Sequence, residues 1–227
     1  MSMRSEKIRV RYENVRPTIT TGSIGLCTGE GWISWTIRVF CLAMGAFKPK
    51  NWRLDYLNEF KNLPSHVFMV IKEKPYRGVF HNSRFRYLVW ESTTLAADGF
   101  SGARIRLLSS VIKNYKGRIR LRIMNGELSA SQKLKLQDFI GSMTGIPYEQ
   151  DIDDMIASAT PWHIGSSSDA NTNCSRLAAR TLQELHILPK QPDAQEYSPW
   201  DFCWLGAVDV NMVDSHFTLG DEIEITR

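Results

Sequence analysis

The segment Asn171–Leu185, NTNCSRLAARTLQEL, is the stretch from which the rest of the chain can be interpreted. Residues that cap helices come first, and leucine and alanine then recur at helical spacing, so an amphipathic helix is predicted to begin at or beside Cys174. A thiol at a helix start lies near unpaired backbone N–H groups and the positive end of the helix dipole, which lower its pKa below the free value of about 8.5. Cys174 is therefore the candidate nucleophile. The alternative is a small buried residue in the first helical turn.

The composition is that of an ordinary globular protein. The chain has 227 residues, of which 43% are hydrophobic and 23% are charged, and its net charge of +4 permits anionic partners without requiring them. No internal repeat or linker stands out. We therefore expect a basic N-terminal arm over 1–20 and a single α+β domain over 21–227.

Cysteine usage and the N-terminal sequence bear on the compartment. The four cysteines are widely spaced with no paired-ligand pattern, which favours reduced thiols over a disulfide framework or a zinc ribbon. The first 17 residues are charged throughout and lack the apolar stretch of a signal peptide, and no run approaches the roughly 20 apolar residues of a membrane span. These features predict a cytoplasmic protein.

Two apolar runs predict neighbouring strands that carry polar residues at their ends. Pro64–Ile71, PSHVFMVI, contains a continuous β-former run typical of a central strand, and His66 opens it. In the second run, YLVWES, the residues Tyr87, Val89 and Glu91 share a face, so Glu91 is the lone charge on an inward side. A buried carboxylate needs a partner, and His66 is the natural candidate.

The other expected elements complete one domain. Ser129-x-x-Gln132 is a capping box that opens a helix through about Met143. The remaining expectations are an edge strand within 8–12, a strand over 23–27, a buried helix in WISWTIRVFCLAM (32–44), a surface helix in 45–63, a strand over 118–123, a polar loop over 160–173, and closing strands over 205–210 and 222–226.

One face of the strand over 118–123 consists of arginines. Arg118, Arg120 and Arg122 alternate with aliphatic residues, which is typical of a half-exposed strand. The face could bind an anionic ligand, but no aromatic stacking platform accompanies it, and acidic residues of 149–154 could cover it. We favour a solvent-exposed face and expect no nucleic-acid partner.

The order of these segments resembles a known family. PSHVFMVI (64–71), VWESTT (89–94), GIPY (145–148) and NCSRLAARTL (173–182) are similar to segments of the circularly permuted papain-like amidases of the YaeF/YiiX type, which are relatives of NlpC-type cell-wall peptidases and lecithin retinol acyltransferases. The resemblance covers roughly Thr21 to Val210. It departs from the family at Gly22-Ser23, where the family has Gly-Asp, and at 45–63, which looks like an insertion.

The resemblance implies a fold and a set of site residues. The fold would be a circularly permuted papain-like (NlpC-like) α+β fold, with a small, mostly antiparallel sheet packed against helices. By resemblance, Cys174 is the nucleophile, His66 the base and Glu91 the third member of a triad. Tyr148 matches a substrate-binding tyrosine that lies beside the pocket.

These residues predict a cysteine hydrolase of the amidase or peptidase class, acting on a peptide or another small amide such as a cell-wall-derived fragment. Two alternatives stay open: a lipid acyltransferase or thioesterase of the same fold, and a non-enzymatic module that binds an anionic partner. No cofactor is expected. A zinc site from His66, His163 and Cys174 would lack a local ligand pair, so no metal is expected either. The oligomeric state is left open.

Overall fold

The computed structural model describes residues 8–30, 34–39, 62–74, 85–94, 99–149, 170–204 and 206–227. Most of the expected surface helix in 45–63 lies outside these residues, which include only its last two positions, Asn62 and Leu63. The expected loop over 160–173 lies outside them as far as residue 169, and so does His163. The strands are β1 (Arg9–Arg11), β2 (Ile24–Gly29), β3 (His66–Glu73), β4 (Arg86–Thr93), β5 (Gly102–Leu107), β6 (Gly117–Asn125) and β7 (Thr218–Thr226). The α-helices with defined bounds are α1 (Tyr12–Val15), α3 (Leu108–Asn114), α4 (Ala130–Met143), α6 (Cys174–Glu184) and α7 (Ala207–Asn211).

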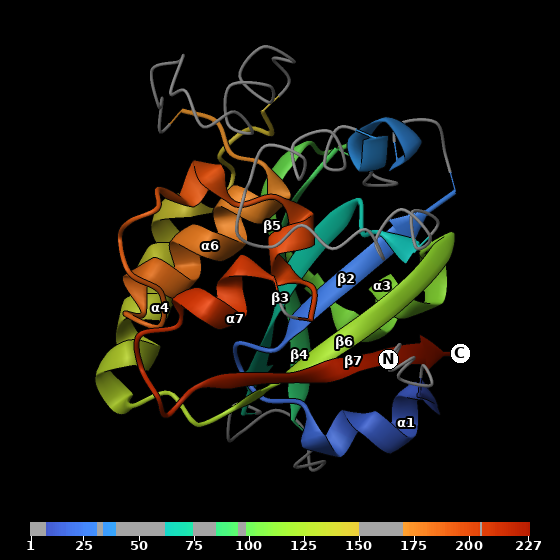
Figure 1. Cartoon of the computed structure of the whole chain (residues 1–227), viewed down its shortest axis with the longest axis horizontal. Helices are drawn as coiled ribbons and strands as arrows, with labels where there is room; N and C mark the ends of the chain where they lie inside the picture. The colour runs from blue at the N-terminus through green and yellow to red at the C-terminus, as the bar shows by residue number, and fades with distance from the viewer. Residues whose placement is uncertain are drawn as a thin grey trace, which may run out of the picture.

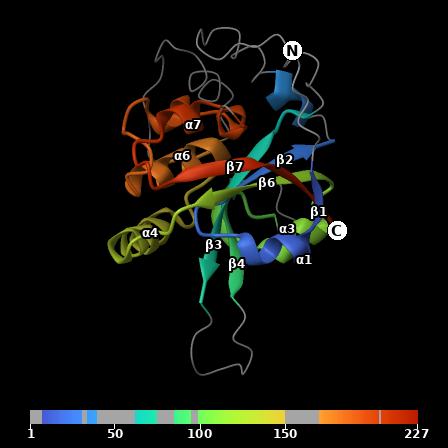
Figure 2. The same cartoon turned by 60° about the horizontal axis from the view of Figure 1, so that its bottom comes forward.

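Within the described residues, seven strands form one sheet in the order β1-β7-β6-β2-β3-β4-β5. Every pair is antiparallel except the parallel pair of β1 with β7. The helices α4, α6 and α7 lie on one side of the sheet, and α1 and α3 lie on the other (Figures 1 and 2). The expected α+β class, with a mostly antiparallel sheet packed against helices, is confirmed.

The interior strand β3 has a core on each of its faces. Val67 and Met69 belong to the core that contains α6, whereas Phe68 and Val70 belong to the core that contains α1 and α3. Because successive side chains of a strand point to opposite faces, a strand covered on both faces needs a continuous apolar run. This explains the sequence of β3 and leaves its first residue, His66, as a polar end.

The arginine face of β6 is largely covered, which corrects the sequence-based prediction; Arg118 is half-buried, and the other two arginines are buried. Arg120 is 6% exposed and Arg122 is fully buried. Arg120 forms an ion pair with Glu222, and Nη2 of Arg122 lies 2.8 Å from Oδ2 of Asp209. The guanidinium of Arg122 also donates to four backbone carbonyls, those of Phe202, Cys203, Leu219 and Gly220.

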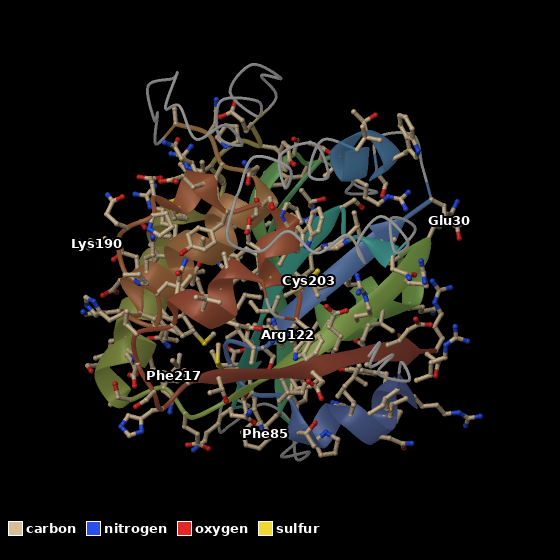
Figure 3. The ribbon with its side chains drawn as sticks, viewed as in Figure 1. Glu30, Phe85, Arg122, Lys190, Cys203 and Phe217 are labelled. Atoms are coloured by element: carbon tan, nitrogen blue, oxygen red, sulfur yellow. The ribbon has the colours of Figure 1, made fainter. Side chains whose placement is uncertain are left out.

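The C-terminal segment therefore supplies the acidic residues and carbonyls that cover Arg120 and Arg122 of β6. Figure 3 shows Arg122 beside Cys203 in the interior of the molecule. A buried guanidinium needs acceptors for its donors, and the residues around α7 and β7 provide them. The covered face offers little surface for an anionic partner.

Two element predictions are wrong in the described residues. The closing strand expected over 205–210 is replaced by α7, which buries Val208, leaves Val210 70% exposed and brings Asp209 to Arg122. A short apolar run cannot by itself distinguish a strand from a helix. Here the helical conformation places Asp209 against the buried guanidinium of Arg122. The helix over 34–39 is not buried: Trp35 is 56% exposed, and Arg38 occupies the inward position.

Other elements agree with the sequence. Ser129 caps α4 in a capping box with Gln132, and β2, β6 and β7 form where strands were expected, as does the short edge strand β1. In the described part of the chain, no helix combines the length and the apolar character needed to cross a bilayer.

Candidate active site

Cys174 is the first residue of α6. Asn173 precedes it as the N-cap, with an extended backbone and a side-chain Oδ1 that accepts from the Arg176 N–H at 2.9 Å. This cap fixes the start of the helix at the thiol. Cys174 is 5% exposed. Among the described residues no acceptor is seen for its own N–H, which lies at the positive end of the helix.

The backbone before Cys174 is anchored on two sides. The Ser92 hydroxyl on β4 donates to the Thr172 carbonyl at 2.8 Å, and the Thr172 N–H donates to the Pro147 carbonyl at 3.0 Å. Tyr148 forms an isolated parallel bridge with Thr172, so it lies near the helix start and is half-buried. The structure thus pairs Tyr148 with Thr172, the residue two positions before Cys174.

His66 begins β3 at the end of the sheet where α6 starts. Its neighbour Ser65 donates its N–H to the Cys27 carbonyl at 2.8 Å, which fixes the chain at this point. Nε2 of His66 lies 2.8 Å from Oε2 of Glu91 on β4. The imidazole also interacts with the Cys174 thiol, and this interaction raises the pKa of His66. Since Nε2 faces Glu91, Nδ1 is the ring nitrogen left for the sulfur.

The thiol and the imidazole favour an ion pair. Burial opposes the thiolate, but the charge and the hydrogen bond of His66, together with the N–H groups of Val67 and Ser175, lower the pKa of Cys174 below its usual range. Burial likewise opposes the imidazolium, but Cys174 and Glu91 outweigh it and raise the pKa of His66 to about 10. Both shifts favour the thiolate–imidazolium pair over the neutral thiol and imidazole.

Glu91 is ionised although its side chain is only 1% exposed. Burial would raise its pKa, but His66 and Arg106 lower the pKa below the ordinary value. Arg106, on β5, donates from Nε to Oε1 of Glu91 at 2.6 Å. Sequence reasoning missed Arg106. The sequence contains one indication of such a residue, because a buried carboxylate needs a cationic partner. Which of the nearby arginines is that partner depends on the register of β4 with β5.

The other thiols and histidines of the described residues differ from this group. Cys27 and Cys203 are buried, and burial raises the pKa of each well above its usual range, as expected for thiols packed in the core. His186 lies beyond the end of α6, with Nε2 2.8 Å from Nζ of Lys135, and His216 is exposed. No cluster of three or more metal-ligating side chains occurs in the described ranges.

The site contains the kinds of groups that nucleophilic catalysis by a thiol requires. It combines a thiol at a helix start, an imidazole and a buried carboxylate that contacts the imidazole. The structure brings Cys174, His66 and Glu91 together and places Tyr148 on the segment that contacts Thr172.

The comparisons with known proteins are sparse. No protein-family model matches the sequence, and no curated protein matches it significantly. Among solved structures, the chain is similar to the metalloprotein yiiX from Escherichia coli O157:H7, with 18% identity and a TM-score of 0.43 over 74% of this chain and 67% of that chain. We therefore take the function from the geometry of the residues alone.

Proposed function

We propose that the chain is a cysteine hydrolase of circularly permuted papain-like fold that cleaves an amide bond through a Cys174–His66–Glu91 triad. The observation that supports this most is the buried thiol at the start of α6, which interacts with the His66 imidazole, whose Nε2 lies 2.8 Å from a buried carboxylate. A structural cysteine would have no need of this arrangement, which lowers the pKa of the thiol.

The reaction begins with the ion pair already formed. The Cys174 thiolate attacks the carbonyl carbon of the amide and forms a C–S bond, and negative charge moves to the carbonyl oxygen. The N–H of Cys174 at the helix start can donate to that oxygen. The His66 imidazolium then gives its proton to the departing nitrogen, the C–N bond breaks, and an amine and a Cys174 thioester remain.

Water completes the cycle. Neutral His66 takes a proton from water, the hydroxyl oxygen attacks the thioester, and the C–S bond breaks to release a carboxylic acid and return the thiolate and imidazolium. Glu91 holds the Nε2–H of the ring and offsets the imidazolium charge in both halves of the reaction. Tyr148, beside Thr172, is proposed to contact the substrate. A peptide or another small amide is the expected substrate class.

The first experiment is alkylation of Cys174 by iodoacetamide, followed by mass spectrometry across a range of pH. In wild type we expect fast alkylation at mildly acidic pH. In His66→Ala we expect alkylation at about pH 6 to slow by about two orders of magnitude, because a thiol with the free pKa of about 8.5 is less than about 1% ionised there.

The chain contains its own controls for this measurement. Cys27 and Cys203 are buried thiols whose pKa is raised, so they should stay unmodified in the folded protein. Hydrolysis of a panel of short peptides and acyl-amino-acid amides, with the thioester on Cys174 trapped by acid quenching, then tests the reaction itself. A slow Cys174 that does not respond to the loss of His66 would refute the hydrolase proposal.

A further inference from the structure

The Glu91 carboxylate is bound at both of its oxygens. Oε2 lies 2.8 Å from Nε2 of His66, and Oε1 accepts from Nε of Arg106 at 2.6 Å and also forms an ion pair with Nη2 of Arg106. The guanidinium thus makes a two-nitrogen contact with the oxygen that His66 does not use. The carboxylate is 1% exposed, whereas the side chain of Arg106 is 29% exposed.

The strand register explains why this arginine makes the contact. Glu91 is opposite Arg104 and Val89 is opposite Arg106 in the antiparallel pair of β4 with β5. Arg106 therefore reaches diagonally along the ladder to Glu91, at a spacing that long side chains can bridge. The guanidinium of Arg104, directly across, lies over the Phe100 ring at 5.7 Å.

We propose that Arg106 is a positioning residue of the reaction, which holds the Glu91 carboxylate in the place and charge state that orient His66. This role rests on the proposed hydrolase function. Without Arg106, a carboxylate that is 1% exposed would have His66 as its remaining cationic partner, and burial would raise its pKa and favour the protonated form. A protonated Glu91 would no longer offset the imidazolium, and the thiolate would lose the partner that stabilises it.

Within the part of the chain that the structure describes, the titratable groups near Glu91 are few. His66 on β3 and Arg106 on β5 contact it, Arg104 is opposite it in register, and the Cys27 thiol on β2 interacts with it electrostatically. Burial raises the pKa of Cys27 well above its usual range, so that thiol stays neutral. A titration that appears near neutral or acidic pH when Arg106 is removed, and that disappears when Glu91 is also replaced, is therefore assigned to Glu91.

A double-mutant cycle tests the proposal with Cys174 alkylation as its readout, which requires no substrate. The four proteins are wild type, Arg106→Gln, Glu91→Gln and the double variant. We expect Arg106→Gln to add an inflection on the acid side of the pH profile, below which alkylation slows about tenfold or more. In the Glu91→Gln background the same substitution should have no further effect, because the carboxylate through which it acts is gone.

A matched control and a conservative variant separate this role from a structural one. Arg86→Gln removes an exposed arginine of β4 that pairs with Glu73, and its profile should equal that of wild type. Arg106→Lys keeps the charge but lacks the paired Nε and Nη2 donors, so its inflection should lie between those of wild type and Arg106→Gln. This variant also decides the question if Arg106→Gln does not fold.

The outcomes are distinct from those of the hydrolase test. An Arg106→Gln or Arg106→Lys profile identical to wild type overturns the positioning role, even if the protein hydrolyses amides. An effect of equal size with and without Glu91 also overturns it, since Arg106 would then act by another route. If no amide is hydrolysed but the inflection appears only when Glu91 is present, the hydrolase proposal fails and the positioning role of Arg106 stands.

Discussion

The protonation states of Cys174 and His66 determine the pH range in which the proposed reaction can proceed. The pKa of Cys174 is lowered by His66 and by two backbone N–H groups, and the pKa of His66 is raised to about 10. We therefore expect the rate of amide hydrolysis to fall on the acid side as the thiolate gains a proton. It should fall again on the alkaline side as His66 passes about pH 10 and no longer carries the proton needed by the leaving amine.

Alkylation provides the control for that profile. The reaction with iodoacetamide needs only the thiolate, so its rate should stay high above the pH at which hydrolysis falls. Measuring both rates on one preparation separates loss of the general acid from unfolding. Hydrolysis that keeps rising through about pH 10 would mean that His66 is not the proton donor.

The site residues that are marked by patterns within a few neighbouring residues could be predicted from the sequence. Capping residues followed by helical periodicity place Cys174 at a helix start, and strand alternation marks Glu91 as an inward charge that needs a partner. Arg106 could not be predicted in this way. Its contact with Glu91 depends on a diagonal in the pairing of β4 with β5, and alternation within one strand does not reveal the register.

At the scale of the element, the N-cap of α6 should affect both stability and reactivity. Asn173→Ala removes the acceptor for the Arg176 N–H, and we expect it to lower the free energy of unfolding by about 0.5–2 kcal/mol. Because the thiol lies in the first turn, a frayed helix start should also slow alkylation of Cys174 at mildly acidic pH. Urea unfolding and alkylation measure the two effects.

The cap of α4 is the matched control. Ser129 accepts from the Gln132 N–H at 3.2 Å, in a capping box that contacts none of the site residues. Ser129→Ala should cost a similar amount of stability and leave the alkylation rate of Cys174 unchanged. If both variants slowed alkylation equally, general loosening of the fold would explain the result, and the cap of α6 would have no specific effect on the thiol.

Elements with strong end signals were predicted well, and elements that depend on distant contacts were not. The capping box of α4 and the polar-to-helical transition at α6 are encoded within a few residues. By contrast, α7 occupies a short apolar stretch whose conformation is decided by the contact of Asp209 with Arg122 on β6. The sequence does not reveal this contact, so the alternating arginines of β6 were predicted to form an exposed face.

At the scale of the whole molecule, Arg122 connects the C-terminal segment to the sheet. It is fully buried, contacts Asp209 and donates to four carbonyls between residues 202 and 220. Arg122→Ala would leave those acceptors buried without their donor, and we expect it to lower the free energy of unfolding by about 3–5 kcal/mol in urea titrations.

Arg86→Gln is again the comparison. Its ion pair with Glu73 spans 3.9 Å between side chains that are 60% and 49% exposed, so its loss should cost about 1 kcal/mol or less. Equal effects of the two variants would contradict the view that Arg122 holds the C-terminal segment against β6. The overall strand order, with β7 between β1 and β6, has no signature in the sequence, because it depends on pairings between remote segments.

The parallel pairing of β1 with β7 has a consequence for how the chain is made. A ribosome produces Arg9 long before Glu224, its partner in the sheet, so β1 cannot pair until β7 has been synthesised. The proposed proton carrier at His66 is likewise translated well before the nucleophile at Cys174. A nascent chain therefore has no assembled reactive centre until α6 has left the exit tunnel, and it completes its outer edge later still.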